Sequence, residues 1–148
     1  MEFLWQLEIV VNLFLQSLGD WLKSPMSFFS FLGTEEFFLI VLPALYWCVD
    51  SGAGFRIAVM LLLSNGVNGL LKLAFHAPRP YWFDSRVRAL STETSFGIPS
   101  GHAQNAASMW GLMAWLVRRK WFTVVSVITI FLIGFSRLYL GVHFTSDV

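Results

Sequence analysis

Long apolar segments constrain the fold of this chain more than any other feature. Four stand out: Phe37–Val49, Ile57–Phe75, Ala103–Val117 and Trp121–Leu140. A helix needs about 20 apolar residues to cross hydrocarbon, and flanking aromatic residues extend the shorter segments into the interface. With 56% hydrophobic and only 13% charged residues, a chain of 148 residues has more apolar surface than a soluble core can bury. We therefore expect an all-α fold, a polytopic transmembrane helix bundle.

A fifth segment, Phe3–Leu18, carries a polar stripe. Glu8, Asn12 and Gln16 recur every four residues, so they share one face of a helix whose other face is apolar. Two arrangements remain open for residues 1–30. The helix either spans with its polar face turned inward or lies amphipathically in the interface. The sequence shows no internal repeat and no low-complexity linker, so we expect residues 1–148 to form a single membrane-embedded domain.

Charge and cysteine content limit the partners. A net charge of +1 provides no basic stripe for a nucleic acid. The single cysteine, Cys48, provides neither a disulfide framework nor a thiolate cluster. The three histidines lack zinc spacing, and no acid-rich cluster suits Mg²⁺ or Ca²⁺. We therefore expect no metal and no cofactor, whereas the oligomeric state stays undetermined.

The connection between the third and fourth apolar segments sets the expected topology. It consists of Arg118-Arg119-Lys120, and a tight basic hairpin normally stays on the cytoplasmic side. The loop His76–Gly101 also carries arginines, which weakens a plain charge count. One conclusion does not depend on that count. The third and fourth segments cross the membrane in opposite directions, so the chain after the fourth segment lies on the same face as the start of the third. We expect that face, with Pro99–His102 and the residues after Leu140, to be extracytoplasmic.

Unusual polar residues gather on this face from three strings, KLAFHAPRP, PSGH and SRLYLGVHFTSD. Lys72, Arg79 and Arg137 can surround a compact dianion, and the arginine fork matches phosphate oxygens. Ser100 and Gly101 stand at a helix start, where backbone N–H groups, a hydroxyl and the positive end of the helix dipole favour an anion. These residues indicate a phosphate site.

Two histidines and one carboxylate complete the set. His143 and Asp147 are four residues apart, so on a helix the carboxylate can accept a proton from one ring nitrogen and leave the other to attack. His102 lies one residue inside the helix that starts at Ser100 and Gly101, where a protonated imidazole could donate to a leaving-group oxygen. The polar loop residues are expected to form a solvated surface: Asp84, Arg86, Arg88 and Glu93.

The three strings resemble the signature of the type 2 phosphatidic acid phosphatases, Lys-x6-Arg-Pro, Pro-Ser-Gly-His and Ser-Arg-x5-His-x3-Asp, over about half the chain. The resemblance implies a metal-independent lipid phosphatase that acts on a lipid phosphate monoester or diphosphate through a phosphohistidine intermediate at the extracytoplasmic face. It also implies the individual roles. Lys72, Arg79, Ser100, Gly101 and Arg137 bind the phosphoryl group, His143 is the nucleophile, Asp147 orients it and His102 is the general acid.

Several alternatives stay open. The chain could transfer the phosphoryl group to another lipid, or it could be a catalytically inactive membrane protein that binds phospholipid headgroups. Soluble vanadium haloperoxidases share the signature, but the hydrophobicity of this chain argues against them. In the resembled family the third string leads into a further membrane helix, so we expect the final helix of the bundle to lie beyond Val148. The sequence does not name the lipid.

A polar stripe within the second segment also has two interpretations. Ser64, Asn68 and Lys72 follow one another at intervals of four residues, on one face that leads to the phosphate site. Such side chains are costly in a membrane unless they face protein or water. They either hold helices together or hydrate and support the catalytic end.

Overall fold

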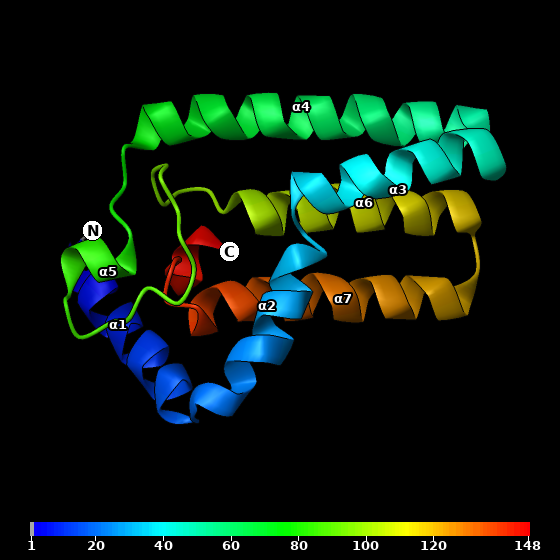
Figure 1. Ribbon diagram of the computed structural model, residues 1–148. Coiled ribbons are helices and arrows are strands. Elements are labelled where there is room, and N and C mark those ends of the chain that lie inside the picture. The colour runs from blue at the N-terminus through cyan, green and yellow to red at the C-terminus, as the bar shows by residue number, and fades with distance from the viewer. Residues whose placement is uncertain (1) are drawn as a thin grey trace.

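The computed structural model describes residues 2–148 and confirms the all-α prediction, because it contains no strand among them. In chain order the helices are α1 (Glu2–Ser17), η1 (Asp20–Leu22), α2 (Lys23–Phe31), α3 (Glu35–Cys48), α4 (Ser51–Phe75), α5 (Pro80–Phe83), α6 (Gly101–Val117), α7 (Lys120–Tyr139) and η2 (Thr145–Asp147). Figure 1 shows α4, α6 and α7 side by side. Helix α3 packs on α4, α2 packs on α7, and α1 contacts α7 and α5.

Side chains and backbone conformation fix where these helices begin and end. The Thr34 hydroxyl accepts from the N–H of Phe37 at 3.1 Å, and the Asp50 carboxylate accepts from the N–H of Ala53 at 2.6 Å. These two residues are therefore the N-caps of α3 and α4. Arg118 adopts the left-handed conformation, with φ 54°, and ends α6. The basic hairpin is thus the tight connection that the sequence predicts.

The number of clear membrane spans is smaller than the sequence predicts. By length and composition, the segment Ser51–Phe83, which contains α4, and helix α7 can cross a membrane. A third span results if η1–α2 and α3, bent by 49°, are taken as one broken span. Helix α6, which contains the predicted segment Ala103–Val117, is not among these candidates. Helix α6 has only 17 residues, and its first turn is polar.

Helix α1 turns its polar stripe inward, onto the end of α7 and the segment after it. The Asn12 amide donates to the carbonyl oxygens of Leu138 at 2.8 Å and His143 at 3.1 Å. The Gln16 amide donates to the carbonyl oxygen of Arg88 at 2.7 Å. The opposite face of α1 is exposed and apolar. The polar stripe therefore faces the protein, and both arrangements of the segment, spanning or interfacial, stay open.

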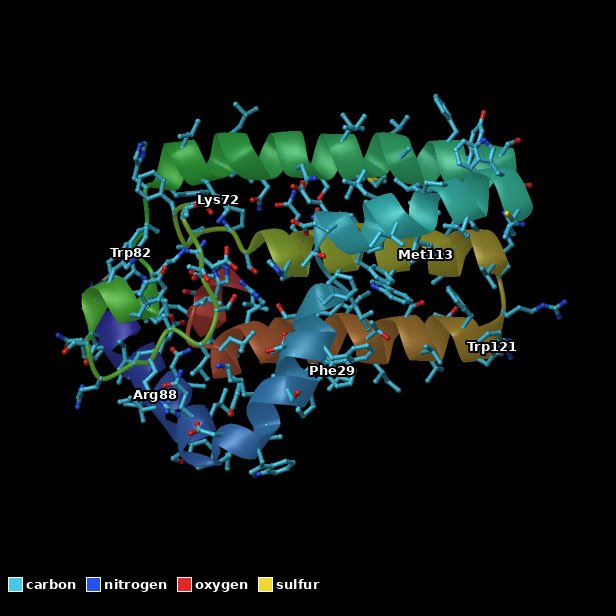
Figure 2. The ribbon with its side chains drawn as sticks, viewed as in Figure 1. Phe29, Lys72, Trp82, Arg88, Met113 and Trp121 are labelled. Carbon is cyan, nitrogen blue, oxygen red and sulfur yellow. The ribbon has the colours of Figure 1, made fainter. Side chains whose placement is uncertain are left out.

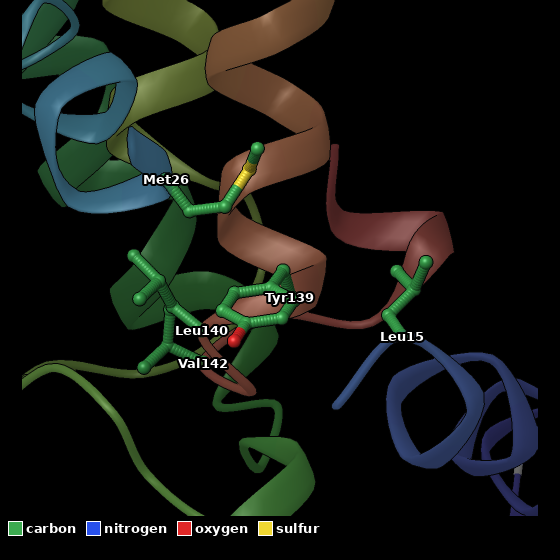
Figure 3. Close-up of a cluster of buried hydrophobic side chains, with 5 residues drawn as sticks. All are labelled: Leu15, Met26, Tyr139, Leu140 and Val142. Atoms are coloured by element: carbon green, nitrogen blue, oxygen red, sulfur yellow. The ribbon is translucent and has the colours of Figure 1, made fainter. Parts of the chain in front are cut away.

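A hydrophobic cluster joins the N-terminal helices to the end of α7 (Figure 3). The buried members of this cluster are Leu15, Met26, Tyr139, Leu140 and Val142. The Tyr139 hydroxyl reaches out of the cluster and donates to the carbonyl oxygen of Gly19 at 2.7 Å. Because Val142 directly precedes His143, this cluster fixes the backbone on which that histidine lies.

Polar side chains hold α4 against α6. The Ser64 hydroxyl donates to Asn105 at 2.7 Å, and the Gln104 amide donates to the carbonyl oxygen of Ser64 at 2.8 Å. One turn further along α4, the Asn68 amide donates to the Gln104 side-chain oxygen at 2.9 Å. The polar stripe therefore links two helices, as the first interpretation of its sequence states. The contact sets the start of α6 beside the last turn of α4, where Lys72 lies.

Candidate active site

The three polar strings meet at one end of the bundle. In Figure 1 this is the left end, where α4 and α7 finish and α6 begins. A cavity of about 200 Å³ opens there, and five of the eight predicted site residues line it: Lys72, Arg79, Gly101, His102 and His143. The remaining three lie behind its wall. Arg137 contacts Glu93, Asp147 contacts His143, and the N–H of Ser100 donates to the carbonyl oxygen of Asp147.

Lys72 lies in the last turn of α4, next to the loop that precedes α6 (Figure 2). Its ammonium group donates to the carbonyl oxygens of Phe96 and Gly97. Gly97 in turn lies against the backbone of Pro78, where a Cβ would stand 2.6 Å from the carbonyl oxygen. The close approach requires glycine, and it keeps the loop within reach of Lys72.

Arg79 and Arg137 are buried deep in the site, with side chains only 1% exposed. The Nε of Arg79 donates to the carbonyl oxygen of Ser95 at 2.6 Å, and its Nη1 donates to that of Val142 at 2.9 Å. The Nη1 of Arg137 donates to the Ser30 hydroxyl at 2.5 Å. Carbonyl and hydroxyl oxygens orient these guanidinium groups, but an anion is needed to balance their buried charge.

Glu93 supplies that anion, so the expectation that it belongs to a solvated surface is wrong. One carboxylate oxygen accepts from Nη2 of Arg137, and the other lies 3.6 Å from Nη2 of Arg79. The expectation holds for Arg86 on the same loop, whose side chain is 71% exposed and pairs with the half-buried Asp84. A charge count could have indicated Glu93, because three cations converge while Asp147 is committed to His143. Nothing in the local pattern of the sequence singles out Ser30.

The start of α6 presents backbone donors to the cavity. Ser100 is the N-cap, and its hydroxyl accepts from the N–H of Ala103 at 3.4 Å. A Cβ at Gly101 would lie 3.2 Å from the side-chain oxygen of Asn68, so glycine allows α4 to approach this turn. The positive end of the helix dipole and the first N–H groups of α6 favour an anion at this position.

His143 and Asp147 pair as predicted, although a tight turn rather than an α-helix brings them together. The Nδ1 atom of His143 lies 3.2 Å from Oδ2 of Asp147, which also accepts from the N–H of Phe144 at 2.9 Å. Because an ionised carboxylate can only accept a hydrogen bond, the proton of the neutral imidazole lies on Nδ1. Nε2 then carries the lone pair and lies 3.4 Å from Nη1 of Arg79.

Burial shifts the pKa of both members of this pair. Desolvation, followed by the positive charges of Arg137 and Arg79, holds the pKa of His143 well below its ordinary value. Desolvation raises the pKa of Asp147 to about 6, although the hydrogen bond from the N–H of Phe144 opposes this shift. At neutral pH the imidazole is therefore neutral and the carboxylate ionised, which is the state a nucleophilic histidine requires.

Comparison with known proteins identifies the family. The model of the PAP2 superfamily, which contains the type 2 phosphatidic acid phosphatases, matches residues 53–148. This chain belongs to the PAP2 superfamily. The match includes all eight predicted site residues, and within residues 2–148 no group of three or more His, Cys, Asp or Glu side chains is placed to hold a metal ion.

Individual PAP2 relatives cover most of the chain. It is 31% identical over 147 residues to phosphatidylglycerophosphatase B of Bacillus subtilis, an alignment that covers 86% of this chain and 67% of the relative. It is 32% identical over 139 residues to a probable sphingosine-1-phosphate phosphatase of Dictyostelium discoideum. That alignment covers 80% of this chain but only 32% of the relative, so the chain spans about a third of the longer protein.

Solved PAP2 structures share the fold. The transmembrane PAP2-type phosphatidylglycerolphosphate phosphatase of B. subtilis superposes with a TM-score of 0.84 at 25% identity, covering 97% of this chain and 76% of that one. LpxE of Aquifex aeolicus gives a TM-score of 0.84 at 23% identity and covers 97% of this chain and 84% of that one. The chain is therefore a multi-pass membrane protein with the helical architecture of transmembrane PAP2 proteins.

The Asp147 carboxylate predicts an acid limit to activity. Below a pH of about 6 the carboxyl group is protonated and no longer accepts the Nδ1 proton of His143, so kcat/KM should fall as the pH decreases through this value. The measurement is a pH profile with an aryl phosphate of an acidic phenol, whose own second ionisation lies at lower pH. Asp147→Asn should be slower and should lack this limit. An unchanged acid limit in the variant would assign it to another group.

Proposed function

We propose that this chain is a metal-independent phosphatase that hydrolyses a lipid phosphate monoester or diphosphate through a phosphohistidine intermediate. One observation carries the proposal. The unprotonated nitrogen of His143 faces a cavity whose walls also hold Lys72, Arg79 and the start of α6. A compact dianion is the ligand that these donors and charges fit, and phosphorus in that dianion would lie next to the nucleophile.

The chemistry follows from this placement. Nε2 of His143 attacks phosphorus in line while the bond to the leaving-group oxygen breaks and that oxygen takes a proton from His102. The charge of the bound dianion offsets the three cations around His102, which favours its protonated form in the complex. Lys72, Arg79 and Arg137 stabilise the charge that develops on the phosphoryl oxygens. Water, deprotonated by His102, then breaks the N–P bond and releases phosphate.

An apolar cavity beside the site supports a lipid substrate. It has a volume of about 690 Å³, and it shares Asn65, Lys72 and Ser95 with the phosphate cavity. Its apolar wall comes from α4 and from Trp82, which Figure 2 shows near the Lys72 end of the molecule. The tail would enter laterally along α4. The relatives' names include phosphatases of phosphatidylglycerophosphate and sphingosine 1-phosphate, so we assign the lipid phosphate class but no single lipid.

The basic hairpin supports an assignment of the side of the membrane. Arg118, Arg119 and Lys120 connect α6 to α7 at the end of the bundle opposite to the site (Figure 1). Because short basic connections stay cytoplasmic, we propose that the phosphate cavity opens on the extracytoplasmic side.

Replacing His143 and replacing His102 should reduce activity in different ways. His143→Ala removes the attacking atom, so turnover should fall by more than about 10³-fold, and no acid-labile phosphoprotein should form. His102→Ala removes the proton donor, so its defect should shrink for an aryl phosphate whose leaving group is a weak base. His76→Ala, an exposed histidine outside the cavity, is the matched control and should retain activity.

The same assays separate the alternatives. EDTA should leave the wild-type rate unchanged, and loss of activity that Mg²⁺ restores would contradict a metal-independent reaction. A phosphoprotein trapped in His143→Ala would contradict the assigned nucleophile. Phosphoryl transfer to an added lipid alcohol, without release of phosphate, would instead identify a lipid phosphotransferase.

Filling the apolar cavity should separate lipid substrates from soluble ones. A Cβ at Gly69 would have no neighbour within 4 Å, so Gly69→Leu should fold and narrow the cavity. We expect kcat/KM for a long-chain lipid phosphate to fall by about tenfold or more, with little change for a soluble aryl phosphate. Gly111→Leu on α6, which is equally uncrowded, is the control. An equal loss for both substrates would contradict the proposed tail site.

The proposed orientation can be tested by cysteine labelling. On a background without Cys48, a cysteine at position 88 should react with an impermeant thiol reagent added from outside, because Arg88 lies on the long loop next to the site. A cysteine at position 119 should react only after the membrane is permeabilised. Labelling at 119 but not at 88 from outside would reverse the topology.

A further inference from the structure

The carboxylate of Glu93 occupies the part of the site in which a phosphate would bind. It contacts Nη2 of both Arg79 and Arg137. Nη1 of the same Arg79 guanidinium lies 3.4 Å from the Nε2 atom of His143, so these nitrogens face the proposed point of attack. Glu93 also lines the phosphate cavity. One carboxylate therefore accepts from Nη2 of Arg137 and lies within ion-pair distance of Arg79, the two cations that phosphoryl oxygens would need.

Two anions at these nitrogens would be unfavourable. Backbone and hydroxyl oxygens already accept from Nε, Nη1 and Nη2 of Arg79 and from Nη1 of Arg137. Nε of Arg137 is the buried guanidinium nitrogen of the two residues that has no partner within residues 2–148. A dianion placed beside an ionised carboxylate in a buried site would experience strong repulsion. Binding of phosphate therefore requires that the Glu93 carboxylate leave.

We propose that Glu93 is an exchangeable counter-ion of the phosphate site, which pairs with Arg79 and Arg137 when the site is empty and yields them to the phosphate of a bound ligand. The inference rests on the proposed function, since it assumes that the cavity binds phosphate. It assigns Glu93 a role in setting affinity and specificity rather than in the chemical steps.

The structure provides a simple route for the exchange. The side chain of Glu93 is 18% exposed, whereas those of both arginines are 1% exposed, so only the carboxylate has access to solvent. Its backbone is held in place, because the Tyr81 hydroxyl donates to the carbonyl oxygen of Glu93 at 3.0 Å. Ser95, two residues after Glu93, accepts a hydrogen bond from Nε of Arg79 through its carbonyl oxygen. A rotation of the side chain is therefore sufficient, and the loop does not need to open.

The exchange gives the enzyme a way to distinguish its substrate from its product. Displacing Glu93 costs the same free energy for every phosphate that binds. A lipid phosphate offsets this cost by burying its tail in the apolar cavity, whereas inorganic phosphate has no tail. Glu93 should therefore promote release of the phosphate product while it leaves the binding of the lipid favourable.

The test compares Glu93→Gln, which keeps the shape but removes the charge, with Asp84→Asn on the same loop. Asp84 is paired with the exposed Arg86 and does not line the cavity. The measurement is the inhibition constant of inorganic phosphate, and of vanadate, against turnover of a soluble aryl phosphate. For Glu93→Gln we expect both constants to fall by about tenfold, which corresponds to about 1.4 kcal/mol of lost competition. Asp84→Asn should not change them.

A purely structural role for Glu93 predicts the opposite sign. If the carboxylate only aligned the two arginines, its loss would weaken phosphate binding and raise both inhibition constants. Raised or unchanged constants in Glu93→Gln, with lipid phosphate hydrolysis by the wild type intact, would overturn this inference and leave the proposed function standing. A wild type that neither hydrolyses lipid phosphates nor binds phosphate would reject the proposed function itself.

Thermal unfolding in detergent gives a second measurement that does not depend on turnover. Without Glu93 the two buried guanidinium groups lack an anion, so Glu93→Gln should unfold at a lower temperature than the wild type in the absence of phosphate. Saturating phosphate should then raise its unfolding temperature by more than it raises that of the wild type, because no carboxylate has to be displaced. An equal or smaller increase would contradict the exchange.

Discussion

Two buried guanidinium groups, those of Arg79 and Arg137, impose the constraint on which the rest of this structure depends. A charge withdrawn from water needs oriented oxygen atoms around it, and here these come from distant parts of the chain. Carbonyl oxygens of the loop before α6 and of the segment after α7 surround Arg79, while α2 supplies the Ser30 hydroxyl to Arg137. The loop before α6, the segment after α7 and helices α2 and α7 therefore meet where positive charge must be solvated by protein.

The sequence predicts which residues meet at the site better than it predicts the residues that surround them. Spacing within the three strings was sufficient to place His102, His143 and the cationic residues at one end of a helical bundle, because parity of the helices brings those strings to one face. The contacts of Glu93 and Ser30 with the buried arginines could not be predicted from the sequence, for a physical reason. A single carboxylate in a polar loop looks like any solvated residue, and only the three-dimensional charge balance shows that two buried cations need it.

The helices, like the site, were predicted from the sequence only in part. Apolar length correctly indicated α4 and α7, but α6 falls short, since its first turn is composed of the polar residues that the site and the contact with α4 require. A helix whose first turn makes polar contacts with α4 and lines a charged cavity cannot be apolar throughout. The polar stripe of Asn12 and Gln16 on α1 was visible in the sequence. Its partners are mostly backbone carbonyl oxygens, which every residue has, so the sequence does not show which of them accept.

The hydrogen bond from Asn12 to the backbone of His143 joins residues that are 131 positions apart. The ribosome makes Asn12 long before His143, so the amide of Asn12 has no such partner until the intervening chain has been translated. The carbonyl oxygen of Asp147, which receives the N–H of Ser100, arrives later still. The cavity can therefore assemble only after the segment that carries His143 and Asp147 has been translated, and until then Arg79 lacks the carbonyl oxygen of Val142 that orients it.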